Sequence, residues 1–155
     1  MVKKTAFLII VAVILFPGRA AGHGIGTDFI RLFDRNQGSG SGMINIHGQI
    51  GVAGDAAVTL GYAGDDNLVI LESGIKYYFG RYMDSSFIQL GIGYYDRDTH
   101  RRDFGLIPVI GYERKLSRYL AISGTIRMVA GVDADVIGYN KSPVFQPGLS
   151  ILITY

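Results

Sequence analysis

The sequence predicts an all-β protein, an eight-stranded antiparallel up-and-down β-barrel. Apolar residues recur at every second position, which is the period of a strand and not of a helix. Seven segments rich in Gly, Asp, Asn, Ser or charge interrupt this alternation and leave eight strand-like runs. After residue 22, no stretch is apolar over the length of a transmembrane helix.

Residues 1–22 are predicted to be a signal peptide, followed by a barrel that spans residues 23–155. "MVKK" is basic, "AFLIIVAVILF" is an apolar run, and "PGRAAG" supplies small residues for cleavage. The alternative, a membrane-spanning helix, would need about 20 apolar residues. Without Lys3, Lys4 and Arg19, 12 of the 15 Lys and Arg remain against 13 Asp and Glu. This balance gives no reason to expect a nucleic-acid partner.

The eight runs differ in how clearly they alternate. They are predicted at residues 25–33, 43–52, 56–63, 67–79, 86–95, 104–113, 119–132 and 145–155. In five of them one face is apolar: Ile44, Ile46, Ile50 and Val52; Val69, Leu71, Ile75, Tyr77 and Phe79; Ile88, Leu90, Ile92 and Tyr94; Leu120, Ile122, Ile126 and Met128; and Phe145, Pro147, Leu149, Ile151, Ile153 and Tyr155. The first run is ambiguous, because placing Phe29 and Arg31 outward sends Asp28 inward.

The alternation fits two kinds of barrel, and the aromatic positions favour one of them. A soluble carrier would turn the apolar face inward, whereas a membrane barrel turns it toward lipid. In an up-and-down meander, aromatic residues fall at both ends of the strands: Phe33, Tyr62, Tyr94, Phe104 and Phe145 at one rim, and Tyr77, Phe79, Tyr112 and Tyr155 at the other. Two aromatic girdles with aliphatic residues between them are typical of membrane barrels.

The last strand carries the most specific motif. "GLSILITY" ends on Tyr155, with Ile153 and Ile151 in the same phase. In this respect the chain resembles small eight-stranded bacterial outer-membrane β-barrels, such as OmpX and the OmpA transmembrane domain. The resemblance implies export to the outer membrane, contact with outer-membrane lipids, and recognition of Tyr155, Ile153 and Ile151 by the barrel-assembly machinery.

Three charged residues fall on the inward face of the predicted strands. Glu72, Lys76 and Arg127 would lie in a lumen that is just wide enough for side chains to fill. Buried charges need partners, so we expect a structural ion-pair network here, with Glu72 and Arg127 at similar depth. The alternative is a porin-like path for ions or small solutes.

The outward-facing arginines could recognise phosphate. The segment "DRDTHRRD" contributes Arg97, Arg101 and Arg102, and the outward phase of the first run would add Arg31. Guanidinium groups suit phosphates of lipopolysaccharide or an acidic external partner, whose identity the sequence does not indicate. For "DRDTHRRD" we favour a solvated loop that keeps the strand ends in water, with phosphate contact as the alternative. No cofactor or metal site is expected, since the aspartates lack EF-hand spacing.

A catalytic role has little support in the sequence. Lipid A palmitoyltransferases carry His, Asp and Ser in external loops, and His100, Asp96 or Asp98, and Ser39 or Ser41 could be arranged in that way. The H-x-S pattern of lipid A deacylases is absent. We therefore expect a non-catalytic barrel with a structural or surface-interaction role, ahead of a narrow channel and of a lipid A-modifying enzyme.

Overall fold

The structure is a computed structural model that describes residues 22–36, 41–98, 101–139 and 141–155. Apart from Gly22, the expected signal peptide falls outside these ranges. So do Ser39 and His100, the candidates for catalytic chemistry in the loops.

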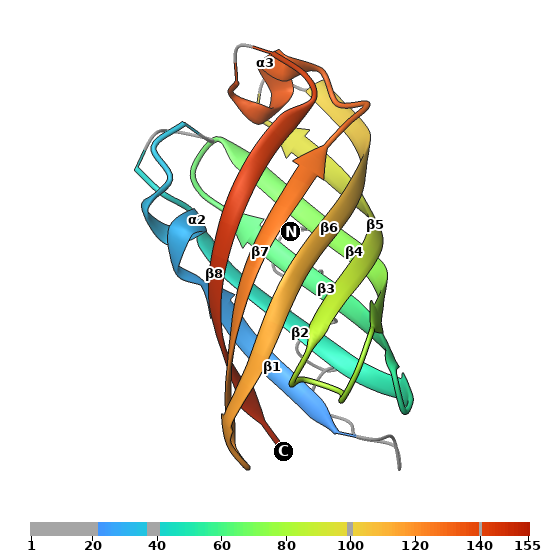
Figure 1. Cartoon of the computed structure of the whole chain (residues 1–155). Helices are drawn as coiled ribbons and strands as arrows, with labels where there is room; N and C mark the ends of the chain where they lie inside the picture. Colours follow the sequence, from blue (N-terminus) through green and yellow to red (C-terminus); the bar gives the residue numbers. More distant parts are fainter. Residues whose placement is uncertain (1–21, 37–40, 99–100, 140) are drawn as a thin grey trace.

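Eight antiparallel strands form a closed up-and-down barrel, as the sequence predicts (Figure 1). The elements in chain order are β1 (His23–Asp28), α2 (Phe29–Phe33), β2 (Ile44–Ala53), β3 (Ala56–Gly64), β4 (Leu68–Tyr78), β5 (Ser86–Arg97), β6 (Arg101–Ser117), β7 (Leu120–Val129), α3 (Ala134–Ile137) and β8 (Val144–Thr154). Each strand pairs with the next, and β1 pairs with β8 to close the barrel. None of the described helices is long and apolar enough to cross a membrane.

The apolar faces of the strands form the outer surface of the barrel. Along β8 exposed and buried residues alternate without a break, so that Phe145 is 66% exposed and its neighbour Gln146 only 6%. On β7, Ile126 is exposed, whereas the next residue, Arg127, turns its side chain inward. The apolar face therefore points outward, and not inward as it would in a soluble carrier.

The first strand has six residues and ends at Asp28, whereas the sequence predicted a run that extends to residue 33. The Asp28 side chain accepts hydrogen bonds from the backbone N–H groups of Ile30 (3.0 Å) and Arg31 (3.3 Å) and thereby caps α2. An aspartate that caps the first turn of a helix satisfies N–H groups that would otherwise lack partners. The change from strand to helix also changes which side chains face inward.

The sixth strand is longer than expected at both ends. The predicted run at residues 104–113 left residues 114–118 as a turn, but β6 continues through Glu113 to Ser117. At its other end, β6 begins at Arg101 and pairs with β5 up to Arg97, so most of "DRDTHRRD" is strand and not loop.

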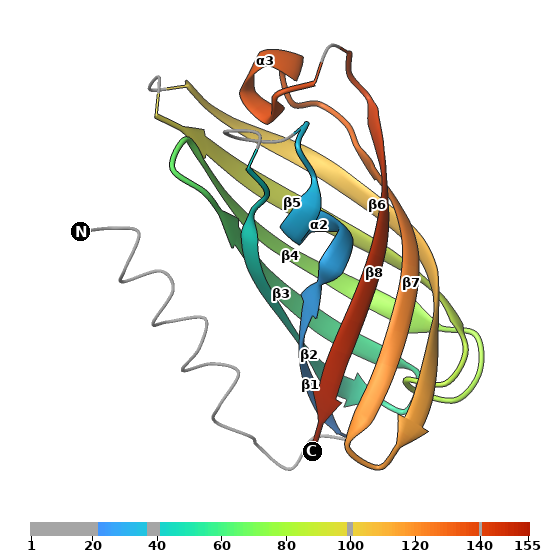
Figure 2. The same ribbon diagram turned by 90° about the vertical axis from the view of Figure 1, so that its left-hand side faces the viewer.

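Apolar side chains fill the interior at both ends of the barrel. We call the end that carries α3 the upper end, and the end where the chain terminates the lower end (Figure 2). The upper cluster consists of Met43, Ala63, Leu68, Ile70, Tyr95, Val129, Val132, Val136, Ile137 and Val144. The lower cluster consists of Ala57, Tyr78, Phe87, Ile107 and Val109. Polar and charged residues occupy the space between the two clusters.

Candidate functional site: charge clusters inside the barrel

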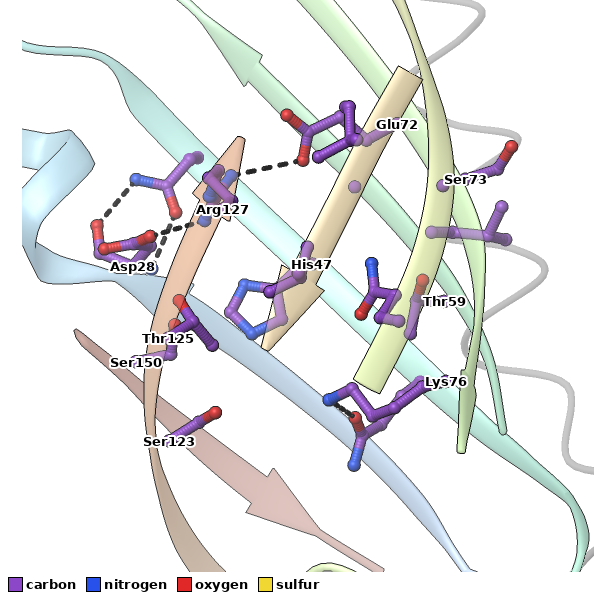
Figure 3. A pocket seen from close by; sticks show the side chains of 18 of the residues that line it. Asp28, His47, Thr59, Glu72, Ser73, Lys76, Ser123, Thr125, Arg127 and Ser150 are labelled. Carbon is purple, nitrogen blue, oxygen red and sulfur yellow. Dashed lines mark hydrogen bonds and ion pairs between the residues drawn. The ribbon is translucent and has the colours of Figure 1, made fainter. Parts of the chain in front are cut away.

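Four charged side chains meet in the upper half of the lumen and form what we call the Asp28 cluster. Arg127 bridges both carboxylates, with its Nη2 atom 2.8 Å from Asp28 Oδ2 and its Nη1 atom 3.4 Å from Glu72 Oε2. Arg31 Nη2 lies 2.7 Å from Glu72 Oε1. Two cations and two anions therefore neutralise each other within the barrel. Figure 3 shows Arg127 between Asp28 and Glu72.

The Asp28 cluster joins elements that are distant in the sequence. Asp28 ends β1, Arg31 lies on α2, Glu72 lies on β4 and Arg127 lies on β7. Asp28 Oδ1 accepts an additional hydrogen bond from the backbone N–H of Leu149 on β8 (3.3 Å). The cluster thus ties α2 to three strands across the lumen.

A second set of groups in the lower half of the lumen forms the Glu113 cluster. Lys76 Nζ lies 2.6 Å from Glu113 Oε1 and also donates to Gln49 Oε1 at 2.7 Å. The other carboxylate oxygen, Glu113 Oε2, accepts hydrogen bonds from Gln49 Nε2 (3.2 Å) and from the Tyr78 hydroxyl. The Lys76 ammonium also lies 4.2 Å from the centre of the Phe87 ring, within range of a cation–π contact. The Lys76 ammonium and both oxygens of the Glu113 carboxylate therefore all have hydrogen-bond partners.

A cavity of about 80 Å³ separates the two clusters. Its walls carry both clusters and several uncharged polar residues, namely His47, Thr59, Gln89, Ser123, Thr125 and Ser150. Figure 3 shows His47 and Thr125 between the Arg127 and Lys76 ends of the cavity. The volume and the polar lining suit a few water molecules. Thr125 Oγ1 is a buried hydroxyl without a protein partner, which such a water would satisfy.

The structure places the three predicted lumen charges inside the barrel, but it divides them between the clusters. Glu72 and Arg127 contact each other, whereas Lys76 pairs with Glu113 and belongs to the lower cluster. Sequence reasoning missed Glu113 because it was assigned to the edge of a turn. Strand alternation from Val109 through Gly111 would have placed Glu113 on the inner face.

Arg31 corrects an expectation from the sequence. One phase of the ambiguous first run would have turned Arg31 outward, toward lipopolysaccharide phosphate, but Arg31 is only 7% exposed and pairs with Glu72 in the lumen. The cause is the helical turn after Asp28, which breaks the alternation on which the expectation relied.

The other three arginines lie at the upper end of the barrel. Arg97 donates to the backbone oxygens of Asp135 and Val136 in α3, and Arg101 lies 3.3 Å from an Asp135 carboxylate oxygen. Arg102 lies 3.5 Å from Asp96 on the neighbouring strand. The side chains of Arg101 and Arg102 remain more than half exposed, so both are open to an external anion.

The C-terminal residues lie on the lower, outer part of the closing seam. Ile151 and Ile153 face outward and pair with β1 through Thr27 and Ile25. Tyr155 exchanges two backbone hydrogen bonds of 3.1 Å with His23. The backbone of Tyr155 therefore extends the pairing between β1 and β8 at the lower end of the barrel.

The chain is therefore a closed eight-stranded β-barrel with an apolar exterior and a polar interior whose charges balance. Among the described residues, no group of three or more His, Asp and Glu is arranged to hold a metal ion. No protein-family model matches the chain, and no curated protein is significantly similar to it.

Proposed function

We propose that the protein is an outer-membrane β-barrel with a non-catalytic, structural or surface-interaction role. The observation that carries the proposal is the exposed apolar belt around the barrel. Aliphatic residues such as Ile75, Leu90, Ile110 and Ile126 are each 55–64% exposed. A belt of this extent would favour aggregation in water, but it suits the hydrocarbon of a bilayer.

The aromatic residues support the same proposal. Exposed aromatic side chains gather near the upper end (Phe33, Phe104 and Phe145) and near the lower end (Tyr77, Phe79, Tyr112 and Tyr155). Girdles of this kind mark the two interfaces of a bilayer. The length of β8, 11 residues, also suits a tilted transmembrane strand.

Contacts with external partners would be made by the upper end of the barrel. Arg101 and Arg102 present guanidinium groups there beside α3, and they suit phosphates of lipopolysaccharide or an acidic partner. The filled lumen argues against the alternative of a narrow channel, because apolar clusters occupy both ends and the charges between them are paired.

Fractionation of cells that express the protein tests the location. The folded barrel should sediment with the outer membrane and show heat-modifiable migration on a gel. Recovery of the folded protein in the periplasm would contradict the proposal. Planar-bilayer recordings test the channel alternative, because a sealed barrel should give no steady conductance, and an unchanged lipid A mass upon expression would speak against an enzyme.

The role of Tyr155 as an assembly signal can be tested separately. We expect Tyr155→Ser to lower the yield of folded barrel in the outer membrane, although the backbone contact with His23 remains possible. Phe79→Ser is a matched control, because Phe79 is also an exposed aromatic residue near the lower end. Equal yields from the two variants would remove the argument that Tyr155 is an assembly signal.

A further inference from the structure

The barrel wall is incomplete along one seam. β1 pairs with β8 only from Ser150 to Thr154, so no described strand pairs with residues 144–149 of β8 on that side. The pairs between β1 and β2 likewise extend only from Ile50 to His47. Above the end of β1, the barrel is therefore not closed by a continuous ladder of backbone hydrogen bonds.

The helix α2 occupies this opening. Figure 2 shows it beside the upper part of β8, where β1 ends. The backbone N–H of Met43 donates to the carbonyl oxygen of Arg31 at 3.1 Å, and the Arg31 side chain reaches Glu72 on the far side of the lumen. The α2 turn is thus held from the inside by an ion pair.

The unpaired edge of β8 carries few free N–H groups. The N–H of Leu149, which points toward the seam, is satisfied by Asp28 Oδ1. Two residues further up the same edge lies Pro147, which has no N–H to leave unpaired. This edge therefore leaves fewer N–H groups unpaired than an ordinary strand edge of the same length would.

A groove lies on the outer side of the seam. Its floor and walls are the apolar side chains of Phe29, Ile30, Phe33, Phe145 and Pro147, and its volume is about 500 Å³. Its polar rim consists of Asp34, Asn36 and Tyr139, and the Tyr139 hydroxyl donates to Asp34 Oδ2 at 2.7 Å. Burial, followed by the hydrogen bond to Asp34, raises the pKa of Tyr139 to about 12, so the hydroxyl stays protonated at neutral pH.

We infer that this groove binds one acyl chain of an outer-leaflet membrane lipid. The inference rests on the proposed function, since it requires the apolar belt to face a bilayer. The groove continues the belt at Phe145, and its polarity changes from apolar walls to a polar rim beside the upper loops. An outer-leaflet lipid has the same order, with its chain toward the midplane and its headgroup toward the upper end.

The bound chain covers the part of the wall where pairing is missing. Along the ladders from β2 to β6, the barrel presents exposed side chains over paired strands, and lipids there need only form an exchanging annulus. At the seam, the wall consists of one helical turn and the edge of β8. A chain that is held there completes the apolar surface and shields the Asp28 cluster, which lies directly behind α2.

Tryptophan fluorescence tests the inference directly, because the chain contains no tryptophan. Phe33→Trp places a single reporter in the groove, and Leu106→Trp places one on the apolar face of β6, away from it. Each variant is reconstituted into vesicles of dioleoyl phosphatidylcholine with an increasing fraction of the chain-brominated analogue. One held chain should make the fluorescence of Trp at position 33 fall linearly with the brominated fraction. Several exchanging chains should make the fluorescence at position 106 fall more steeply at low fractions.

A second variant tests whether the groove itself causes the linear quenching, and the outcomes separate failure of the groove from failure of the proposed function. Adding Ile30→Ser to the Phe33→Trp protein removes part of the groove and should change its quenching curve to the steeper form, while heat-modifiable migration reports that the barrel is folded. If both reporters follow the same steep curve, the barrel lies in the bilayer but the groove holds no chain, which overturns the inference alone. If neither reporter is quenched, the barrel is not in the bilayer, and the proposed function fails with it.

Discussion

The two charge clusters of the lumen achieve neutrality in different ways. The Glu113 cluster contains one cation and one anion, whose side chains are 7% and 1% exposed. The Asp28 cluster contains two of each, and Arg127 contacts both carboxylates. In the lower cluster the loss of either charge leaves the other without an ion pair. In the upper cluster the loss of Asp28 or Arg31 leaves every remaining charge paired, and the loss of Arg127 leaves the pair of Arg31 with Glu72 and the backbone donors to Asp28. The loss of unfolding free energy caused by each substitution should therefore depend on how many partners the remaining charges keep, and not on burial alone.

The largest effect is expected from the lower cluster. Glu113→Ala leaves Lys76 buried without its counter-charge and should destabilise the barrel by about 3–5 kcal/mol. Urea titration of the barrel in lipid vesicles measures the loss. The double variant Lys76→Met with Glu113→Leu is the control, because replacing a buried pair by apolar groups of similar size is often nearly neutral. A Glu113→Ala loss no larger than that of the double variant would contradict the need for charge compensation.

A smaller effect is expected from the upper cluster. Arg127→Ala should cost about 1–3 kcal/mol, because Glu72 keeps Arg31, and Asp28 keeps its backbone donors. Combining Arg127→Ala with Glu72→Ala should cost less than the two single losses together, as expected for residues in contact. If the losses add, or if Arg127→Ala costs more than Glu113→Ala, the upper cluster is not redundant.

The smallest effect is expected outside the lumen, at the hydrogen bond between Tyr139 and Asp34. Tyr139→Phe removes it and should cost about 0.5–1.5 kcal/mol at neutral pH. The Tyr139 pKa of about 12 lies above the value near 10 of an unfolded tyrosine. The stabilisation is therefore fully present below about pH 10 and is lost as the pH rises toward 12. Unfolding free energies of wild type and variant should converge over this range, and a constant difference would exclude Tyr139 as the titrating group.

The strand faces could be predicted from the sequence because they depend on a local rule. Period two fixes which side chains share a face, and the closed barrel leaves only the choice of which face is outside. For that reason the interior positions of Glu72, Lys76 and Arg127 follow from the sequence alone.

The partners of these charges could not be predicted, because they depend on events outside any one strand. Asp28 acts as a helix cap and so ends β1 early, which turns Arg31 inward against the alternation. Glu113 lies where a charged stretch resembled a turn, although β6 continues through it. The groove beside α2 follows from the same early end of β1.

We propose that the outer face of the barrel contacts lipid, and one pair of substitutions separates lipid from water as its solvent. Ile126 and Leu116 are both 55% exposed on the outer face, but Ile126 lies within β7 and Leu116 lies near the lower end of β6. Unfolding in lipid vesicles should show a loss of about 2–4 kcal/mol for Ile126→Arg and of about 0–1 kcal/mol for Leu116→Arg, because the cost of a charge depends on its depth in a bilayer. A loss of no more than about 1 kcal/mol for Ile126→Arg, equal to that for Leu116→Arg, would mean that both positions face water and would contradict a lipid-facing exterior.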